Sequence, residues 1–343
     1  MKKLIKIIIL LLAISYLPYA VVLAQFELPT SQLPDLNLKP TLSLSVDPTT
    51  PLPDFPVVVA TNLSGALGVN NSVYTWFLNG KKQSESSGLN KNTFSFTAGE
   101  LGGVYTVGVS IVTPGGDNLS DSISLTASDF DLTWSANAQA PARYRGKILP
   151  TQNSTVFLSA LPFVYRPGTK SLIASNGLIY NWSVNDKLDI SNSGVGKFNF
   201  NFRINNFAGD IASVGLEIRN EEKTVSLRKT IEIPVARPQT FIYLADRKTG
   251  LPYGAAIKNL ITGINNSLEF FAESYFFNFT SDKLKWQWLV NNNEIFGETE
   301  KPWLAALNIP SNAKSISTQI QVKVKNLDND IESARSAINL EIK

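Results

Sequence analysis

The chain has 343 residues, of which 43% are hydrophobic and 17% are charged, which is enough for two or three domains that each bury a core. It contains no cysteine and no histidine, which excludes a disulfide framework, thiol or histidine-dependent catalysis and the usual zinc ligands. The formal charge of +3 comes from Lys2, Lys3 and Lys6; without them 28 basic residues face 28 acidic ones, which argues against nucleic acid or an anionic membrane as the main partner.

Residues 1–24 are typical of a bacterial secretory signal helix. Three lysines lie in and before an apolar run that ends in Val22-Leu23-Ala24, a small-residue cleavage pattern. We expect cleavage after Ala24 and export to the cell surface or the medium. The alternative is an uncleaved anchor, in which case this segment alone contacts the membrane. Residues 25–40 contain several prolines and are expected to form an extended linker.

A repeat divides the rest of the chain into three units. Trp76, Trp182 and Trp288 are each separated by 106 residues, within the strings VYTWFLNG, IYNWSVND and KWQWLVNN. Alternating apolar runs recur at matching distances after each tryptophan. The predicted domains are residues 41–128, 129–236 and 237–343.

Short runs of alternating apolar and polar residues predict strands, because successive side chains of a strand point to opposite faces. The first unit has TLSLSV from Thr41, FPVVVAT from Phe55, VYTWFL from Val73, TFSFTA from Thr93, YTVGVSIV from Tyr105 and SISLTA from Ser122. The second and third units repeat this order, beginning with FDLTW from Phe130 and TFIYL from Thr240. Six or seven strands per hundred residues predict an all-β protein of three tandem immunoglobulin-like antiparallel β-sandwiches.

The repeated tryptophan strand is expected to supply the core of each unit. By the two-residue period, two aromatic side chains share one face of this strand in each unit. They are Tyr74 and Trp76, Tyr180 and Trp182, and Trp286 and Trp288. A tryptophan fills the space between two sheets about 10 Å apart, and truncating it is expected to cost about 3–5 kcal/mol. The asparagine three residues after each tryptophan tolerates positive φ and is expected to close a hairpin.

The first unit resembles the polycystic-kidney-disease-type (PKD) and immunoglobulin-like domains of bacterial surface proteins. The resemblance lies in VYTWFLNG followed by GGVYTVGVSIV, within residues 41–128. The second and third units lack the glycine-aspartate-glycine turn of PKD domains, and Ala212 replaces the later tyrosine in the second, so they resemble immunoglobulin-like domains more generally. The resemblance implies an extracellular spacer or binding module without specifying a ligand.

Two kinds of candidate site remain. Asp117, Asp121, Asp328 and Asp330 lie in turns rich in aspartate and asparagine, which fits either calcium binding or ordinary hairpins. The insertions around Tyr144 and Tyr253 are expected either to bind a ligand or to cover a sheet edge.

No carboxylate pair or serine–lysine arrangement has a local signature, so the sequence predicts a protein that is not an enzyme and has no cofactor. We therefore expect an exported or surface-displayed spacer or adhesin, built as a semi-rigid rod, whose partner is a protein or a glycan. One alternative is a module that binds carbohydrate or peptide through the Tyr144 and Tyr253 loops. Another is a component of a pilus or secretion apparatus, because sandwich edges can pair with partner strands.

Overall fold

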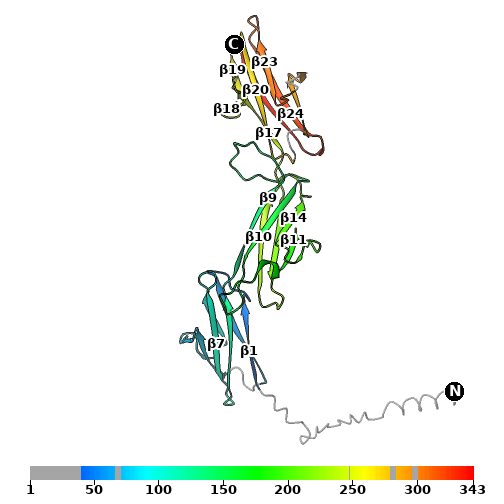
Figure 1. The fold of residues 1–343 in the computed structure, drawn as a ribbon. Helices are drawn as coiled ribbons and strands as arrows, with labels where there is room; N and C mark the ends of the chain where they lie inside the picture. The colour runs from blue at the N-terminus through cyan, green and yellow to red at the C-terminus, as the bar shows by residue number, and fades with distance from the viewer. Residues whose placement is uncertain (1–39, 66–70, 247, 279–282, 296–299) are drawn as a thin grey trace, which may run out of the picture.

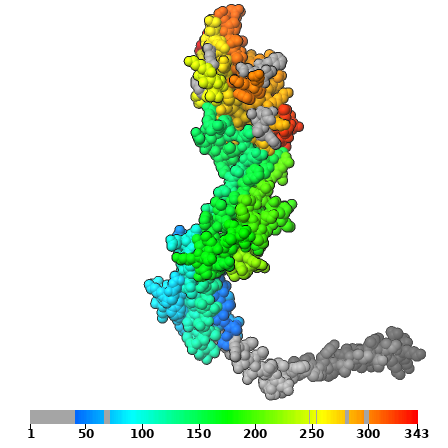
Figure 2. Space-filling model, viewed as in Figure 1, coloured from blue at the N-terminus to red at the C-terminus, as the bar shows by residue number. Residues whose placement is uncertain are grey.

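The computed structural model describes residues 40–65, 71–246, 248–278, 283–295 and 300–343. The expected signal helix of residues 1–24 and nearly all of the 25–40 linker lie outside these residues. Six sheets pair into three β-sandwiches, which confirms the predicted all-β class, and the sandwiches follow one another end to end (Figures 1 and 2). In the described part of the chain, no helix has the length and apolar character needed to cross a bilayer.

The first sandwich packs a three-stranded sheet against a five-stranded one. The first sheet has the order β1-β2-β6, with β1 Thr41–Asp47, β2 Pro56–Ser64 and β6 Thr93–Thr97. The second has the order β4-β3-β7-β8, with β5 beside β3: β4 Lys81–Lys82, β3 Val73–Leu78, β7 Val104–Val112, β8 Asn118–Thr126 and β5 Gly88–Leu89. Burial alternates along these strands, as the two-residue period requires.

The second sandwich repeats this arrangement. Its first sheet has the order β14-β10-β9, with β14 Asn199–Arg203, β10 Thr155–Phe163 and β9 Asp129–Ala136. Its second has the order β12-β11-β15-β16, with β13 beside β11: β12 Lys187–Leu188, β11 Ile179–Val184, β15 Ile211–Arg219, β16 Ser226–Pro234 and β13 Gly194–Val195. A single 3₁₀ turn, η2 Ser175–Gly177, precedes β11.

The third sandwich has additional edge strands. One sheet has the order β18-β17-β20-β23, with β18 Pro252–Tyr253, β17 Gln239–Ala245, β20 Asn266–Tyr275 and β23 Leu304–Ile309. The other has the order β19-β25-β24-β21-β22, with β19 Asn259–Thr262, β25 Ser333–Ile342, β24 Ile316–Asn326, β21 Leu284–Val290 and β22 Asn293–Ile295. The strand pairs of this sandwich are antiparallel as predicted, except that β19 pairs with β25 in parallel. The chain leaves the β17–β18 hairpin, crosses to the other sheet and reaches β25 running in the same direction.

Each sandwich has a core of its own, centred on the repeated tryptophan. Trp76, Trp182 and Trp288 are at most 1% exposed, and they belong to three separate clusters of buried residues. Each indole N–H donates to a backbone carbonyl, at 2.8 Å to Lys91, 2.7 Å to Lys197 and 3.1 Å to Pro302. Burial therefore leaves no unpaired polar atom on these rings.

The repeated asparagine closes the hairpin after the tryptophan strand, as predicted. Asn79, Asn185 and Asn291 adopt φ of 51°, 49° and 47°, and the residue after each also has positive φ, the combination of a type I′ turn. A second role was not predicted. In the first unit, the Asn79 N–H donates to the Thr106 carbonyl and the Thr106 N–H donates to Asn79 Oδ1, both at 2.8 Å. The other two asparagines make the same pair of hydrogen bonds to the neighbouring strand.

Candidate functional site at the domain junctions

The insertion of residues 137–150, which follows β9, packs against the third sandwich at the junction between the two (Figure 1). The Gln139 N–H donates to the Phe277 carbonyl at 2.8 Å, and the Phe276 N–H donates to the Gln139 carbonyl at 2.6 Å. The loop thus continues the backbone pairing of the third sandwich just beyond the end of β20. Because both hydrogen bonds have a defined register, they fix the position of the loop relative to the third sandwich.

An ion pair with a buried carboxylate holds the same loop. Arg143 donates from Nε and Nη2 to one oxygen of Glu273, at 3.0 and 2.7 Å, and the Glu273 side chain is 9% exposed. The Arg143 guanidinium also lies 4.2 Å from the centroid of the Tyr243 ring. The hydrogen bond to Glu273 raises the pKa of Arg143. The buried carboxylate therefore has a permanent cation as its partner.

Two tyrosine hydroxyls extend the hydrogen-bond network of this carboxylate. Tyr275 donates to Glu273 Oε2 at 3.0 Å, and the Tyr243 and Tyr275 hydroxyls lie 3.0 Å apart. Burial, followed by the hydrogen bonds to Tyr243 and Glu273, raises the pKa of Tyr275. Tyr275 therefore stays protonated as a hydrogen-bond donor at neutral pH.

Tyr144, whose insertion we expected either to bind a ligand or to cover a sheet edge, contacts the third sandwich. Its ring meets Tyr275 and Phe276 edge-on, at centroid distances of 5.9 and 5.6 Å. Phe276 has φ of 62°, an unusual backbone conformation for a bulky residue. Tyr253 lies in β18, paired with Leu244 of β17, and its side chain is outside the described part of the structure. The Tyr144 insertion thus joins two domains, and the Tyr253 insertion supplies edge strands.

A second buried carboxylate, Glu332, also lies at this junction. It is 1% exposed and accepts from the Thr151 hydroxyl of the second sandwich. Its other oxygen accepts from the Asn278 N–H at 3.0 Å and from Asn326 Nδ2 at 2.7 Å. Close by, the Asn278 side chain donates to the Asn153 carbonyl at 3.2 Å. Polar groups from both sandwiches therefore satisfy this carboxylate at the junction.

A groove of about 290 Å³ opens beside the insertion. Its walls include Pro141 and Phe271, together with Trp286 of β21 and Trp303. Trp286, which we expected in the core, is half-buried and packs against the core cluster of the third sandwich. Its indole N–H is buried and has no partner among the described residues. The aromatic side chains that line the groove are suited to stacking against a small ligand.

The first and second sandwiches are joined by equally close contacts. Leu52, in the connection between β1 and β2, packs against the core of the second sandwich, and Thr50 Oγ1 accepts from the Ser226 N–H at 2.8 Å. The Thr126 hydroxyl donates to the Thr169 carbonyl at 3.0 Å. Gly168 has φ of 72° and packs so closely that an added Cβ would lie 2.7 Å from the Cβ of Ser124. Both junctions therefore consist of packed and hydrogen-bonded side chains, not of a flexible linker alone.

The four aspartates considered for calcium are separated in the structure. Asp117 accepts from the Thr113 hydroxyl at 3.2 Å, and Asp121 accepts from the Ser122 N–H at 2.8 Å. Asp328 and Asp330 form ion pairs with Lys283 at 3.7 Å and with Lys325 at 2.8 Å. Over the residues that the structure describes, no group of three or more acidic side chains converges on one point.

Sequence reasoning missed the side chains that form the junctions. Arg143 and Glu273 are 130 residues apart, and Thr151 and Glu332 are 181 apart, so no local pattern links them. The available signal was an acidic residue within an otherwise apolar stretch, because Glu273 interrupts the run FFAESYFF in a predicted strand. A charge in such a position usually has a partner.

No protein-family model and no curated protein matches the chain. Several solved structures are similar to it in fold. They include the three N-terminal domains of the bacteriophage RB49 highly immunogenic outer capsid protein Hoc, at 11% identity, covering 89% of this chain and 99% of that one, with a TM-score of 0.25. The central fibronectin-III array of RIM-binding protein has 11% identity, coverage of 90% and 98%, and a TM-score of 0.29. The fibronectin(III)-like modules of Clostridium thermocellum CbhA have 10% identity, coverage of 57% and 94%, and a TM-score of 0.28.

Proposed function

We propose that this protein is a non-enzymatic, exported or cell-surface spacer or adhesin that works as a semi-rigid rod. The observation that carries this proposal is the construction of its junctions. At each junction, side chains of one sandwich bond to or pack within the next, as Leu52 and Arg143 do. Domains joined by flexible linkers move independently, whereas packed and hydrogen-bonded junctions transmit orientation. The predicted secretory signal supports display outside the cell.

Small-angle X-ray scattering of the purified protein tests the rod. Three sandwiches in a line, each roughly 35 Å long, give a particle on the order of 100 Å with a radius of gyration of about 30 Å. A compact globule of this size has a radius of gyration of about 20 Å. A value near the lower figure, or a profile that requires freely reorienting domains, would contradict the proposal.

The groove at the second junction supports a second candidate function, the binding of a carbohydrate. Trp286 and Trp303 line it, and sugar rings stack on such side chains. In a glycan array, Trp303→Ala should abolish a signal seen with the unmodified protein. Leu251→Ala is a matched control, because this exposed residue of the same sandwich is not among the residues that line the groove. Absence of any glycan signal would eliminate this function and leave the rod unaffected.

A further inference from the structure

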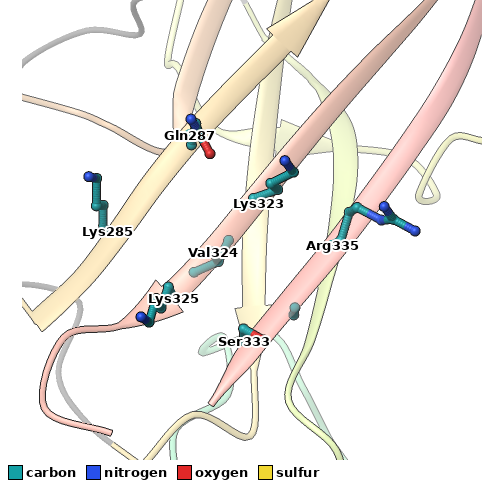
Figure 3. A pocket seen from close by; sticks show the side chains of 8 residues that line it. Lys285, Gln287, Lys323, Val324, Lys325, Ser333 and Arg335 are labelled. Atoms are coloured by element: carbon teal, nitrogen blue, oxygen red, sulfur yellow. The ribbon is translucent and has the colours of Figure 1, made fainter. Parts of the chain in front are cut away.

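One face of the third sandwich is covered by cations. Strands β21, β24 and β25 direct Lys285, Lys323, Lys325 and Arg335 outward, and all four are exposed (Figure 3). Together with Gln287 they border a shallow depression of about 440 Å³. We call this surface the basic face.

The basic face places like charges directly opposite one another. Lys285 pairs with Lys325 across β21 and β24, and Lys323 pairs with Arg335 across β24 and β25. Such cross-strand pairs are destabilising, because the charges repel at close range. Of the four, Lys325 has a carboxylate partner, Asp330 at 2.8 Å. Within the described residues, Lys285, Lys323 and Arg335 form no ion pair.

The corresponding positions of the other sandwiches show that the fold does not require these cations. The row aligned with Lys323 and Arg335 is occupied in the second sandwich by Glu217 and Arg228, which carry opposite charges. In the first sandwich the same row holds only hydroxyl side chains, at Thr75, Ser110 and Ser120. Strand β22 pairs with Trp288–Val290 of β21 and β19 with Asn339–Ile342 of β25, so Lys285 and Arg335 lie where neither edge strand pairs, and edge protection can account for those two. Lys323 and Lys325 lie on β24, between β21 and β25, where edge protection does not apply. The second sandwich also has cations, Arg219 and Arg228, at the positions of Lys325 and Arg335, so what distinguishes the third sandwich is the pairing of like charges across its strands.

The geometry of the basic face favours an extended polymer with regularly spaced negative charges. Neighbouring strands lie about 4.8 Å apart, and outward residues along one strand about 7 Å apart, so the cations form a fixed two-dimensional array. The lining residues include no aromatic ring for stacking nucleic-acid bases. Their apolar members, Val324 and Ala334, are buried and half-buried, so the face offers no anchor for a bilayer.

The Gln287 amide at the border of the face donates to the Glu294 carboxylate at 2.9 Å. We propose that the basic face binds an acidic polysaccharide, whose carboxylate or sulfate groups neutralise Lys285, Lys323 and Arg335. This proposal deepens the adhesin role by naming the class of partner, and it rests on that role only for the presence of the polymer outside the cell. Binding to the face does not depend on the rod, so scattering and binding experiments can fail separately.

Binding of the purified protein to polygalacturonate and to heparin tests the proposal, at low and at physiological ionic strength. Carboxylate and sulfate groups are thus tested separately. We expect affinity to fall as salt rises, because the contacts are between exposed charges. The triple variant Lys285→Gln, Lys323→Gln and Arg335→Gln should bind about tenfold more weakly or worse. Its Tm should equal or exceed that of the unmodified protein, because the cross-strand repulsion is relieved.

A matched control removes three cations from the same sandwich outside the basic face. Lys248, Lys301 and Lys314 are exposed in connections of the third sandwich, and their replacement by glutamine lowers the net charge equally. This variant should bind like the unmodified protein. Equal losses in the two triple variants would show a non-specific charge effect and overturn the proposal. Binding to phosphatidylglycerol vesicles or single-stranded DNA, with none to either polysaccharide, would also overturn it.

Discussion

At the residue scale, the asparagine of each tryptophan motif performs two tasks. Its backbone takes the positive φ of a tight hairpin, and its side chain and N–H hold the next long strand. The first task could be predicted from the sequence, because asparagine is common in such turns. The second could not, because the partner Thr106 lies 27 residues from Asn79, on a strand whose register is set by the assembled sheet.

Substitutions of Asn79 separate these two tasks. Asn79→Ala should lower the unfolding free energy of the first sandwich by about 2 kcal/mol, because alanine is strained at positive φ and cannot accept from Thr106. Asn79→Gly keeps the tolerance of positive φ but removes the acceptor, so its loss should be about 1 kcal/mol, the part that belongs to the side-chain hydrogen bond. Denaturant unfolding measures both. A glycine variant as stable as the unmodified protein would show that the side-chain bond contributes nothing.

Tyr180 makes the second sandwich sensitive to alkaline pH. Burial raises the pKa of Tyr180 to about 12, and the hydroxyl donates to the Ser175 carbonyl at 2.9 Å. The unfolded chain releases this proton near pH 10, so the contribution of Tyr180 is complete below pH 10 and is lost between pH 10 and 12. The loss is as much as about 2–3 kcal/mol.

A pH series with Tyr180→Phe isolates this contribution. Phenylalanine cannot ionise, so the stability difference between the unmodified protein and the variant should shrink or reverse between pH 10 and 12. At pH 7 the variant should lose about 1 kcal/mol, through the missing hydrogen bond to Ser175. Denaturant unfolding at pH 7, 10, 11 and 12 gives these differences. A constant difference would mean that Tyr180 keeps an ordinary pKa in the folded protein.

At the element scale, the insertion of residues 137–150 is a strap between two sandwiches. Its backbone pairs with the third sandwich at Gln139, and Arg143 binds the carboxylate of Glu273. A double-mutant cycle of Arg143→Ala and Glu273→Ala should give a coupling energy of about 1 kcal/mol, modest because the Arg143 side chain is 39% exposed.

Thermal unfolding of the four proteins gives the unfolding free energies for the double-mutant cycle. Hydrogen exchange of residues 137–150 measures the local stability of the strap. Exchange in the strap should accelerate in Arg143→Ala. Arg145 is an exposed arginine of the same loop, and Arg145→Ala should leave exchange unchanged. Coupling near zero, with unchanged exchange in Arg143→Ala, would mean that backbone pairing alone holds the strap.

The tryptophan motif and the alternating runs predicted strands, sandwiches and repeat length, because they reflect local periodicity that every unit must satisfy. The same reasoning gave Trp286 the buried position of Tyr74 and Tyr180. Trp286 does pack against the core, but it is only half-buried and also lines the groove beside residues 139–142 of the second sandwich's insertion, which no local pattern indicates. The role of Tyr144 was missed for the same reason, since its contacts are with Tyr275 and Phe276.

At the scale of the whole molecule, the first sandwich contributes a side chain to the core of the second. Leu52 belongs by sequence to the first sandwich, yet it packs against the buried cluster of the second. The stability of one domain therefore depends on a residue contributed by its neighbour. This kind of coupling makes adjacent repeats unfold together more than independent ones do.

Leu52→Ala tests the coupling with one substitution. It should destabilise the second sandwich by about 1–2 kcal/mol through lost apolar contact, and leave the first nearly unchanged. Leu42→Ala is the matched control, because Leu42 packs against the first core and its loss should affect the first sandwich. Hydrogen exchange resolved by peptide distinguishes the domains, with faster exchange in β11 and β15 for Leu52→Ala and in β3 and β7 for Leu42→Ala. If Leu52→Ala instead accelerated exchange in the first sandwich alone, the junction would be a surface contact without energetic coupling, and orientation would not pass from one sandwich to the next.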